Sequence, residues 1–179
     1  MSLADRPGLD VLPAGWQVQL ADWLLGLQQE LQRRTADALR QQPPERLASV
    51  AAESAGDTIY TLDQDLDEAV HAACERLGER YPFVLIAEGG GGVFPVHASE
   101  ADAAFRLIMD SLDGTRGLMY DKRSAWTLAA VAPNRGPQTS LADILLAVQT
   151  EIPTCKQTLA DSLWAVRGRG VQAFRRNLL

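Results

Sequence analysis

Two aspartates three residues apart, Asp110 and Asp113, stand where a mostly apolar segment, residues 105–109, meets a Gly-Thr step. Gly114 and Thr115 follow directly, so two carboxylates, a hydroxyl and flexible main chain lie within six residues. Hard oxygen ligands of this kind are those that Mg²⁺ prefers. The segment therefore predicts a magnesium site. The local alternative is a hairpin turn, because Asp-Gly between apolar runs commonly forms one.

A third carboxylate, Glu88, ends a second apolar run, residues 83–87. If this strand lies beside residues 105–109, Glu88 and Asp110 emerge at the same edge of the sheet. Carboxylates held that close repel and raise each other's pKa, and a divalent cation relieves the repulsion. A set of oxygen ligands without His or Cys favours Mg²⁺ over Zn²⁺. Taken alone, Glu88 would be an ordinary solvated charge at a strand end.

The Gly114-Thr115 step adds a possible phosphate site. If Thr115 opens a short helix, its free backbone N–H groups can bind a phosphate. Gly114 lets the backbone approach closely, and the Thr115 hydroxyl can orient a water molecule for attack. We therefore expect phosphate ester chemistry at this step.

The elements that must position these residues follow from hydrophobic periodicity. Apolar residues at spacings of three and four predict a helix over 16–39, and a second helix opens at the acidic run 63–68. Apolar runs predict strands at 83–87, 105–109, 126–131, 144–148 and 162–166, and 57–62 is a short strand or extended turn. Two long helices followed mostly by strands favour an α+β fold with layered architecture.

Composition limits the classes of function. The chain has 179 residues, 46% of them hydrophobic, which fits a globular protein, and its net charge of −6 argues against a nucleic-acid binder. Runs of about 20 apolar residues, which could span a membrane, are absent, as is an apolar signal-like N-terminus. Cys74 and Cys155 fit neither a CxxC metal pattern nor a disulfide framework. We expect reduced thiols and a cytoplasmic location.

Three segments occur in an order that resembles the inositol monophosphatase and fructose-1,6-bisphosphatase-like family of Mg²⁺-dependent phosphatases. They are Asp57-Thr-Ile-Tyr-Thr-Leu-Asp63, Ala87-Glu88-Gly89 and Asp110-Ser-Leu-Asp-Gly-Thr115. The resemblance implies a layered αβ sandwich, a phosphomonoesterase acting on a small phosphorylated metabolite, and assembly as a homodimer. It implies the following roles: metal ligands Glu88, Asp110, the Leu112 carbonyl and Asp113; catalytic residues Asp63 and Thr115; phosphate-binding amides Gly114 and Thr115.

The chain also departs from the family pattern. Gly89 replaces a second glutamate, Ser111 replaces a proline, and a later Trp-Asp motif is missing. Family chains are longer, so we expect an incomplete C-terminal part. The expected organisation is a loose segment (1–14), a metal-binding αβ domain (15–136) and a truncated start of a second αβ layer (137–179). The alternative function is a non-catalytic or truncated relative that serves as a binding or oligomerisation module.

Overall fold

The computed structural model describes residues 12, 14–41, 49–54, 57–87 and 92–179. Seven strands form one sheet in the order β4-β3-β5-β6-β7-β8-β9, and β1 (Val50–Ser54) pairs with β2 (Asp57–Tyr60) in a separate two-stranded sheet. The strands of the large sheet are β3 (Phe83–Ala87), β4 (Val93–Val96), β5 (Phe105–Asp113), β6 (Ala125–Pro133), β7 (Leu146–Ile152), β8 (Leu159–Val166) and β9 (Val171–Asn177). Within this sheet β3 and β5 are parallel, and the other neighbouring pairs are antiparallel.

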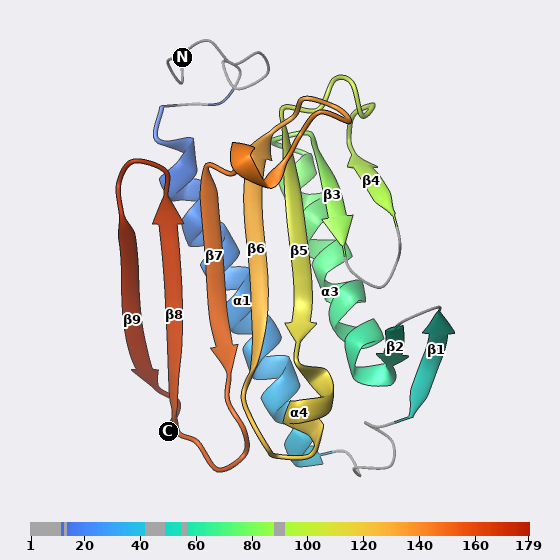
Figure 1. The fold of residues 1–179 in the computed structure, drawn as a ribbon, viewed down its shortest axis with the longest axis vertical. Coiled ribbons are helices and arrows are strands. Elements are labelled where there is room, and N and C mark those ends of the chain that lie inside the picture. Colours follow the sequence, from blue (N-terminus) through green and yellow to red (C-terminus); the bar gives the residue numbers. More distant parts are fainter. Residues whose placement is uncertain (1–11, 13, 42–48, 55–56, 88–91) are drawn as a thin grey trace.

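Two long helices, α1 (Trp16–Gln41) and α3 (Thr61–Gly78), lie on the same face of the sheet (Figure 1). α1 packs mainly against β6 and β7, and α3 packs against β5 and α1. Both helices are amphipathic, and α1 buries a stripe of leucines at spacings of three and four: Leu20, Leu24, Leu27 and Leu31. The described residues also form two short helical turns, α4 (Thr115–Met119) and η2 (Leu141–Asp143).

A buried polar contact fixes α1 on the sheet. Gln28, which is fully buried, donates from Nε2 to the Val148 carbonyl oxygen at 3.1 Å and accepts from Thr150 Oγ1 at 3.0 Å. A buried amide without partners would be costly, so these bonds select one register of α1 on β7. Cys74 is buried on α3, and burial raises the pKa of its thiol to about 12, whereas Cys155 is exposed.

Most predicted elements are confirmed, and the differences lie at the sheet edges. Residues between the predicted strands 83–87 and 105–109 had no predicted element, but Val93–Val96 form edge strand β4 with Pro95 inside it. Proline is tolerated at an edge because that side of the strand needs no N–H donor. The C-terminal segment after residue 170 was not expected to be a strand, yet it forms β9, which is largely exposed and therefore lacks a burial pattern. β6 pairs with β7 across the predicted boundary between residues 136 and 137.

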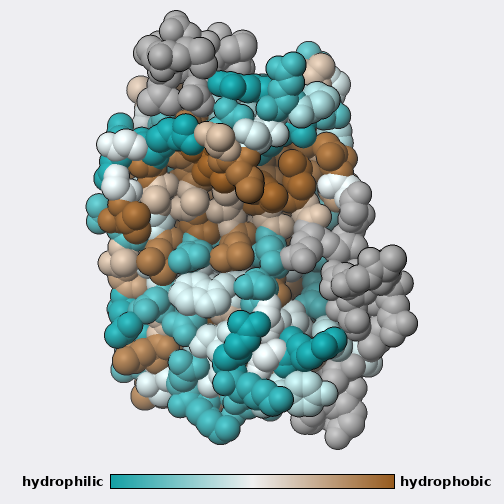
Figure 2. Space-filling model, in the orientation of Figure 1, coloured by the Kyte–Doolittle hydropathy of each residue, from teal (hydrophilic) through white to brown (hydrophobic). Residues whose placement is uncertain are grey.

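The second face of the sheet is not covered by any of the described helices, and its upper half is apolar (Figure 2). Residues of six strands, β3 and β5 to β9, line a shallow groove of about 810 Å³ there; they include Ile86, Ile108, Leu128, Leu163 and Val171. Ile108 and Val171 keep 42% and 65% of their surface exposed. Aliphatic side chains gathered on an open face typically mark a contact surface. The described helices do not include one long and apolar enough to cross a lipid bilayer.

Candidate functional site

The parallel pair β3 and β5 brings two of the predicted motifs to one edge of the sheet. Ala87, the last residue of β3, pairs with Met109, which directly precedes Asp110. The expectation that these strands lie side by side is therefore confirmed. Glu88 itself lies outside the described residues.

The Asp110–Asp113 segment forms a bulge in β5. Asp110 pairs with Leu128 and Asp113 with Trp126, so one extra residue interrupts the register between them. Bulges re-aim side chains and often occur next to functional sites. The half-buried Asp110 accepts a hydrogen bond on Oδ1 from the Leu112 N–H at 3.0 Å, and Asp113 is exposed.

Thr115 opens a short helix, as predicted. Gly114 precedes it with φ at 95°, a left-handed conformation that glycine adopts without strain, and α4 runs from Thr115 to Met119. The alternative of a tight Asp-Gly hairpin is wrong, because α4 and the following turn separate β5 from β6.

Two hydrogen bonds tie this segment to α3. Thr115 Oγ1 lies 2.7 Å from Asp63 Oδ1, and Ser111 Oγ lies 2.7 Å from Asp67 Oδ1. The two acceptors are one helical turn apart on α3, and the two donors are also four residues apart. Asp63 in addition accepts from the Tyr60 N–H at 2.9 Å, which places its carboxylate at the start of the helix. Asp63 and Thr115, predicted to act together, are thus in direct contact.

The sequence motifs did not predict the hydrogen bond between Ser111 and Asp67. The sequence pattern marks the acidic run 63–68 only as a helix start, and Ser111 only as the replacement of a proline. In the structure Ser111 is buried, and its hydroxyl anchors the bulge to α3. The matching i, i+4 spacing of the carboxylates and the hydroxyls was the available signal.

The donors in this segment suit a hard cation, because all of them are oxygens. They comprise the carboxylates of Asp110 and Asp113 and the carbonyl of Leu112, which lies 2.9 Å from Thr115 Oγ1. Among the residues that the structure describes, however, three or more His, Cys, Asp or Glu side chains do not cluster closely enough to hold a metal. A complete magnesium site would need a further ligand, and the predicted one, Glu88, is not described.

The chain was compared with known protein families, curated proteins and solved structures. Protein-family models do not match the chain, and neither do curated proteins. Among solved structures, fructose-1,6-bisphosphatase of Leishmania major in its holo form matches 95% of this chain and 54% of its own, with 14% identity and a TM-score of 0.66. The chain has the fold of fructose-1,6-bisphosphatase.

Two further structures share this fructose-1,6-bisphosphatase fold. The extragenic suppressor protein SuhB of Bartonella henselae, of the inositol monophosphatase family, has 13% identity and a TM-score of 0.60 over 89% of this chain and 53% of its own. A putative sedoheptulose-1,7-bisphosphatase of Toxoplasma gondii has 16% identity and a TM-score of 0.55 over 76% and 43%. The predicted resemblance and the α+β class are confirmed for the fold, and the chain spans about half the length of these structures.

The contact between Thr115 and Asp63 should stabilise the fold as well as the site. We expect Thr115→Val, which keeps the shape and removes the hydroxyl, to lower the free energy of unfolding by about 1–2 kcal/mol, because a partly buried carboxylate loses a donor. Urea unfolding followed by tryptophan fluorescence measures this change. Thr127→Val is the matched control, since its hydroxyl makes only a 3.4 Å contact with the Asp110 carbonyl oxygen. Equal stability of Thr115→Val and the unaltered protein would contradict the prediction.

Proposed function

We propose that this chain carries the site of a Mg²⁺-dependent phosphomonoesterase that acts on a small phosphorylated metabolite. Candidate substrates are an inositol phosphate, a sugar phosphate and a nucleotide 3′-phosphate. The observation that carries the proposal is the 2.7 Å hydrogen bond between Thr115 and Asp63, formed across 52 residues directly beside the Asp110–Asp113 bulge. The fold shared with fructose-1,6-bisphosphatase supports it.

In this proposal each residue has a defined task. Asp110, Asp113, the Leu112 carbonyl and Glu88 hold Mg²⁺, which when bound lowers the pKa of water and offsets charge on phosphoryl oxygens. The Thr115 hydroxyl has one hydrogen. If that hydrogen goes to Asp63, the lone pairs on Oγ1 remain free to accept a hydrogen bond from the attacking water. Asp63 thus orients Thr115, and the Gly114 and Thr115 amides bind the phosphate.

The test is phosphate release from a panel of inositol, sugar and nucleotide phosphates, with and without Mg²⁺. We expect turnover of at least one phosphomonoester that EDTA abolishes and added Mg²⁺ restores. A protein that binds Mg²⁺ but releases phosphate from none of the panel would refute the enzyme assignment.

A second candidate function, a non-catalytic binding or oligomerisation module, is favoured by one observation. The open sheet face presents Ile108 and Val171 to solvent, as a contact surface would. A homodimer is part of either proposal, and sedimentation across a range of concentrations tests it. Calorimetry separates the two functions: a module should show no Mg²⁺ binding that Asp110→Asn removes.

The proposed partners are small metabolites; a nucleic acid and a membrane are not among them. The proposed location is the cytoplasm, where free thiols such as Cys74 and Cys155 stay reduced.

A further inference from the structure

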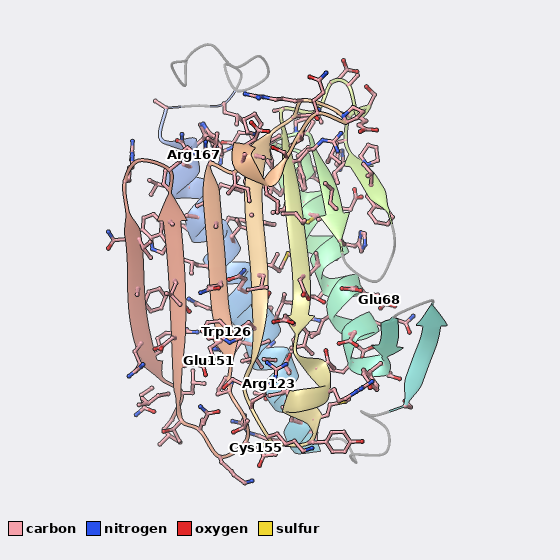
Figure 3. All side chains as sticks on the ribbon, viewed as in Figure 1. Glu68, Arg123, Trp126, Glu151, Cys155 and Arg167 are labelled. Carbon is pink, nitrogen blue, oxygen red and sulfur yellow. The ribbon has the colours of Figure 1, made fainter. Side chains whose placement is uncertain are left out.

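An arginine that the sequence motifs did not include, Arg123, lies against the turn at the start of α4 (Figure 3). A Cβ added to Gly117 would come within 2.8 Å of Cγ and Nε of Arg123. A Cβ added to Gly114 would come within 3.4 Å of its Nη2 atom. Both Gly114 and Gly117 thus face Arg123. Because Gly117 has no side chain, there is room beside it for the aliphatic stem of Arg123.

The chain on either side of Arg123 is held in place. The Lys122 N–H donates to the Gly117 carbonyl oxygen at 3.0 Å, and the Arg123 N–H approaches the same oxygen at 3.4 Å. On the other side Ser124 Oγ donates to Glu151 at 2.6 Å. The main chain that carries Arg123 is therefore held against α4, which keeps its side chain beside the Gly114–Gly117 segment.

In the described part of the chain, the Arg123 guanidinium has neither a hydrogen bond nor an ion pair. Neighbouring Arg116, in contrast, donates to the Tyr60 hydroxyl at 3.1 Å. Six other arginines among the described residues reach carboxylates: Arg33, Arg34, Arg40, Arg106, Arg135 and Arg175. Asp113, one residue from Gly114, is exposed and forms no ion pair with Arg123. Arg123 is exposed, so an anionic ligand can reach it from solvent. In a protein of net charge −6, a cation without a counter-charge beside this turn suits such a ligand.

We propose that Arg123 binds the phosphate group of the substrate beside the Gly114-Thr115 turn, which deepens the proposed function and rests on it. A planar guanidinium offers paired N–H donors that match two phosphate oxygens, which a lysine ammonium cannot do. The substrate class is a phosphate monoester whose dianion lies between the carboxylate-rich bulge and Arg123. Gly117 is a positioning residue, because it leaves space for the arginine stem.

The test measures the dissociation constant of inorganic phosphate by calorimetry, on the full chain with Mg²⁺ present. We expect Arg123→Gln to weaken phosphate binding by roughly ten- to a hundredfold, as losing a charged hydrogen-bond pair does. The phosphate affinity of Arg123→Lys should lie between those of Arg123→Gln and the unaltered protein. Lys122→Gln, which removes an adjacent exposed charge, should bind phosphate as tightly as the unaltered protein does.

Gly117→Ala tests the positioning claim without removing a charge. Alanine favours the helical conformation of α4, so unfolding should not become easier, while the added methyl displaces the arginine stem and weakens phosphate binding. If Arg123→Gln binds phosphate normally, or Lys122→Gln loses as much affinity, the role of Arg123 is refuted and the phosphatase proposal stands. If the unaltered protein neither binds phosphate nor releases it from esters, both proposals fail.

Discussion

Asp110→Asn is expected to reduce Mg²⁺-dependent phosphate release by roughly a hundredfold or more, which corresponds to at least about 2.7 kcal/mol of lost transition-state stabilisation. The substitution removes the negative charge that a cation needs. It keeps Oδ1, which accepts the Leu112 N–H at 3.0 Å, so the bulge should survive. Initial rates on the best substrate of the panel, as a function of Mg²⁺ concentration, measure the effect.

Two comparisons make this result specific to the site. Asp65→Asn removes the same charge from the exposed side of α3 and should leave the rate unchanged. The free energy of unfolding of Asp110→Asn, measured by thermal unfolding, should stay within about 0.5 kcal/mol of that of the unaltered protein. Such small changes are usual for isosteric substitutions away from packed cores. Full turnover by Asp110→Asn would refute the assigned metal ligand, and an equal loss in Asp65→Asn would mean that overall charge matters.

Phe105→Ala is expected to cause the largest loss of stability, about 3–5 kcal/mol. Phe105 is 1% exposed, and its ring stacks on Phe83 with centroids 5.0 Å apart and on Trp16 at 6.4 Å. Truncation therefore removes the contact between β5, β3 and α1 at one point and leaves a cavity. Domains are stable by only about 5–15 kcal/mol, so urea should unfold this variant at a much lower concentration.

The matched control for Phe105 is Phe174→Ala on edge strand β9. Phe174 is 37% exposed, and we expect its truncation to cost less than about 1 kcal/mol. If Phe105→Ala does not fold, Phe105→Leu retains part of the buried surface and should still be less stable than Phe174→Ala. Equal losses at positions 105 and 174 would contradict the packing described for the core.

The fold was predictable where one local pattern carried it. The leucine stripe of α1 predicts a helix, and the apolar run of β3 predicts a strand, each from a short stretch of sequence. Edge strands β4 and β9 escaped detection for the opposite reason. β4 is short and contains Pro95, and β9 carries exposed polar residues near Arg175, so neither shows the alternation that marks a strand. Their strand conformation depends on hydrogen bonds from β3 and β8, which no local pattern reports.

The candidate site was predictable in part. The order of Asp63, Asp110 and Thr115 anticipated a contact that the structure forms, and the Gly114-Thr115 step correctly marked the start of α4. Glu88 and its metal role stay predictions, because that residue is not among those described. Arg123 had no motif to mark it, since its place depends on the space left by a glycine six residues earlier.

Local sequence patterns predict the helices, the inner strands and the acidic residues at strand ends, because hydrophobic period and residue type are local properties. The tertiary structure adds that Ser111 contacts Asp67, that Thr115 contacts Asp63, and that the described helices leave one sheet face uncovered. The two contacts depend on how α3 packs against β5, two segments more than 40 residues apart in the sequence. Side chains distant in sequence become partners only after the backbone has fixed their separation and direction.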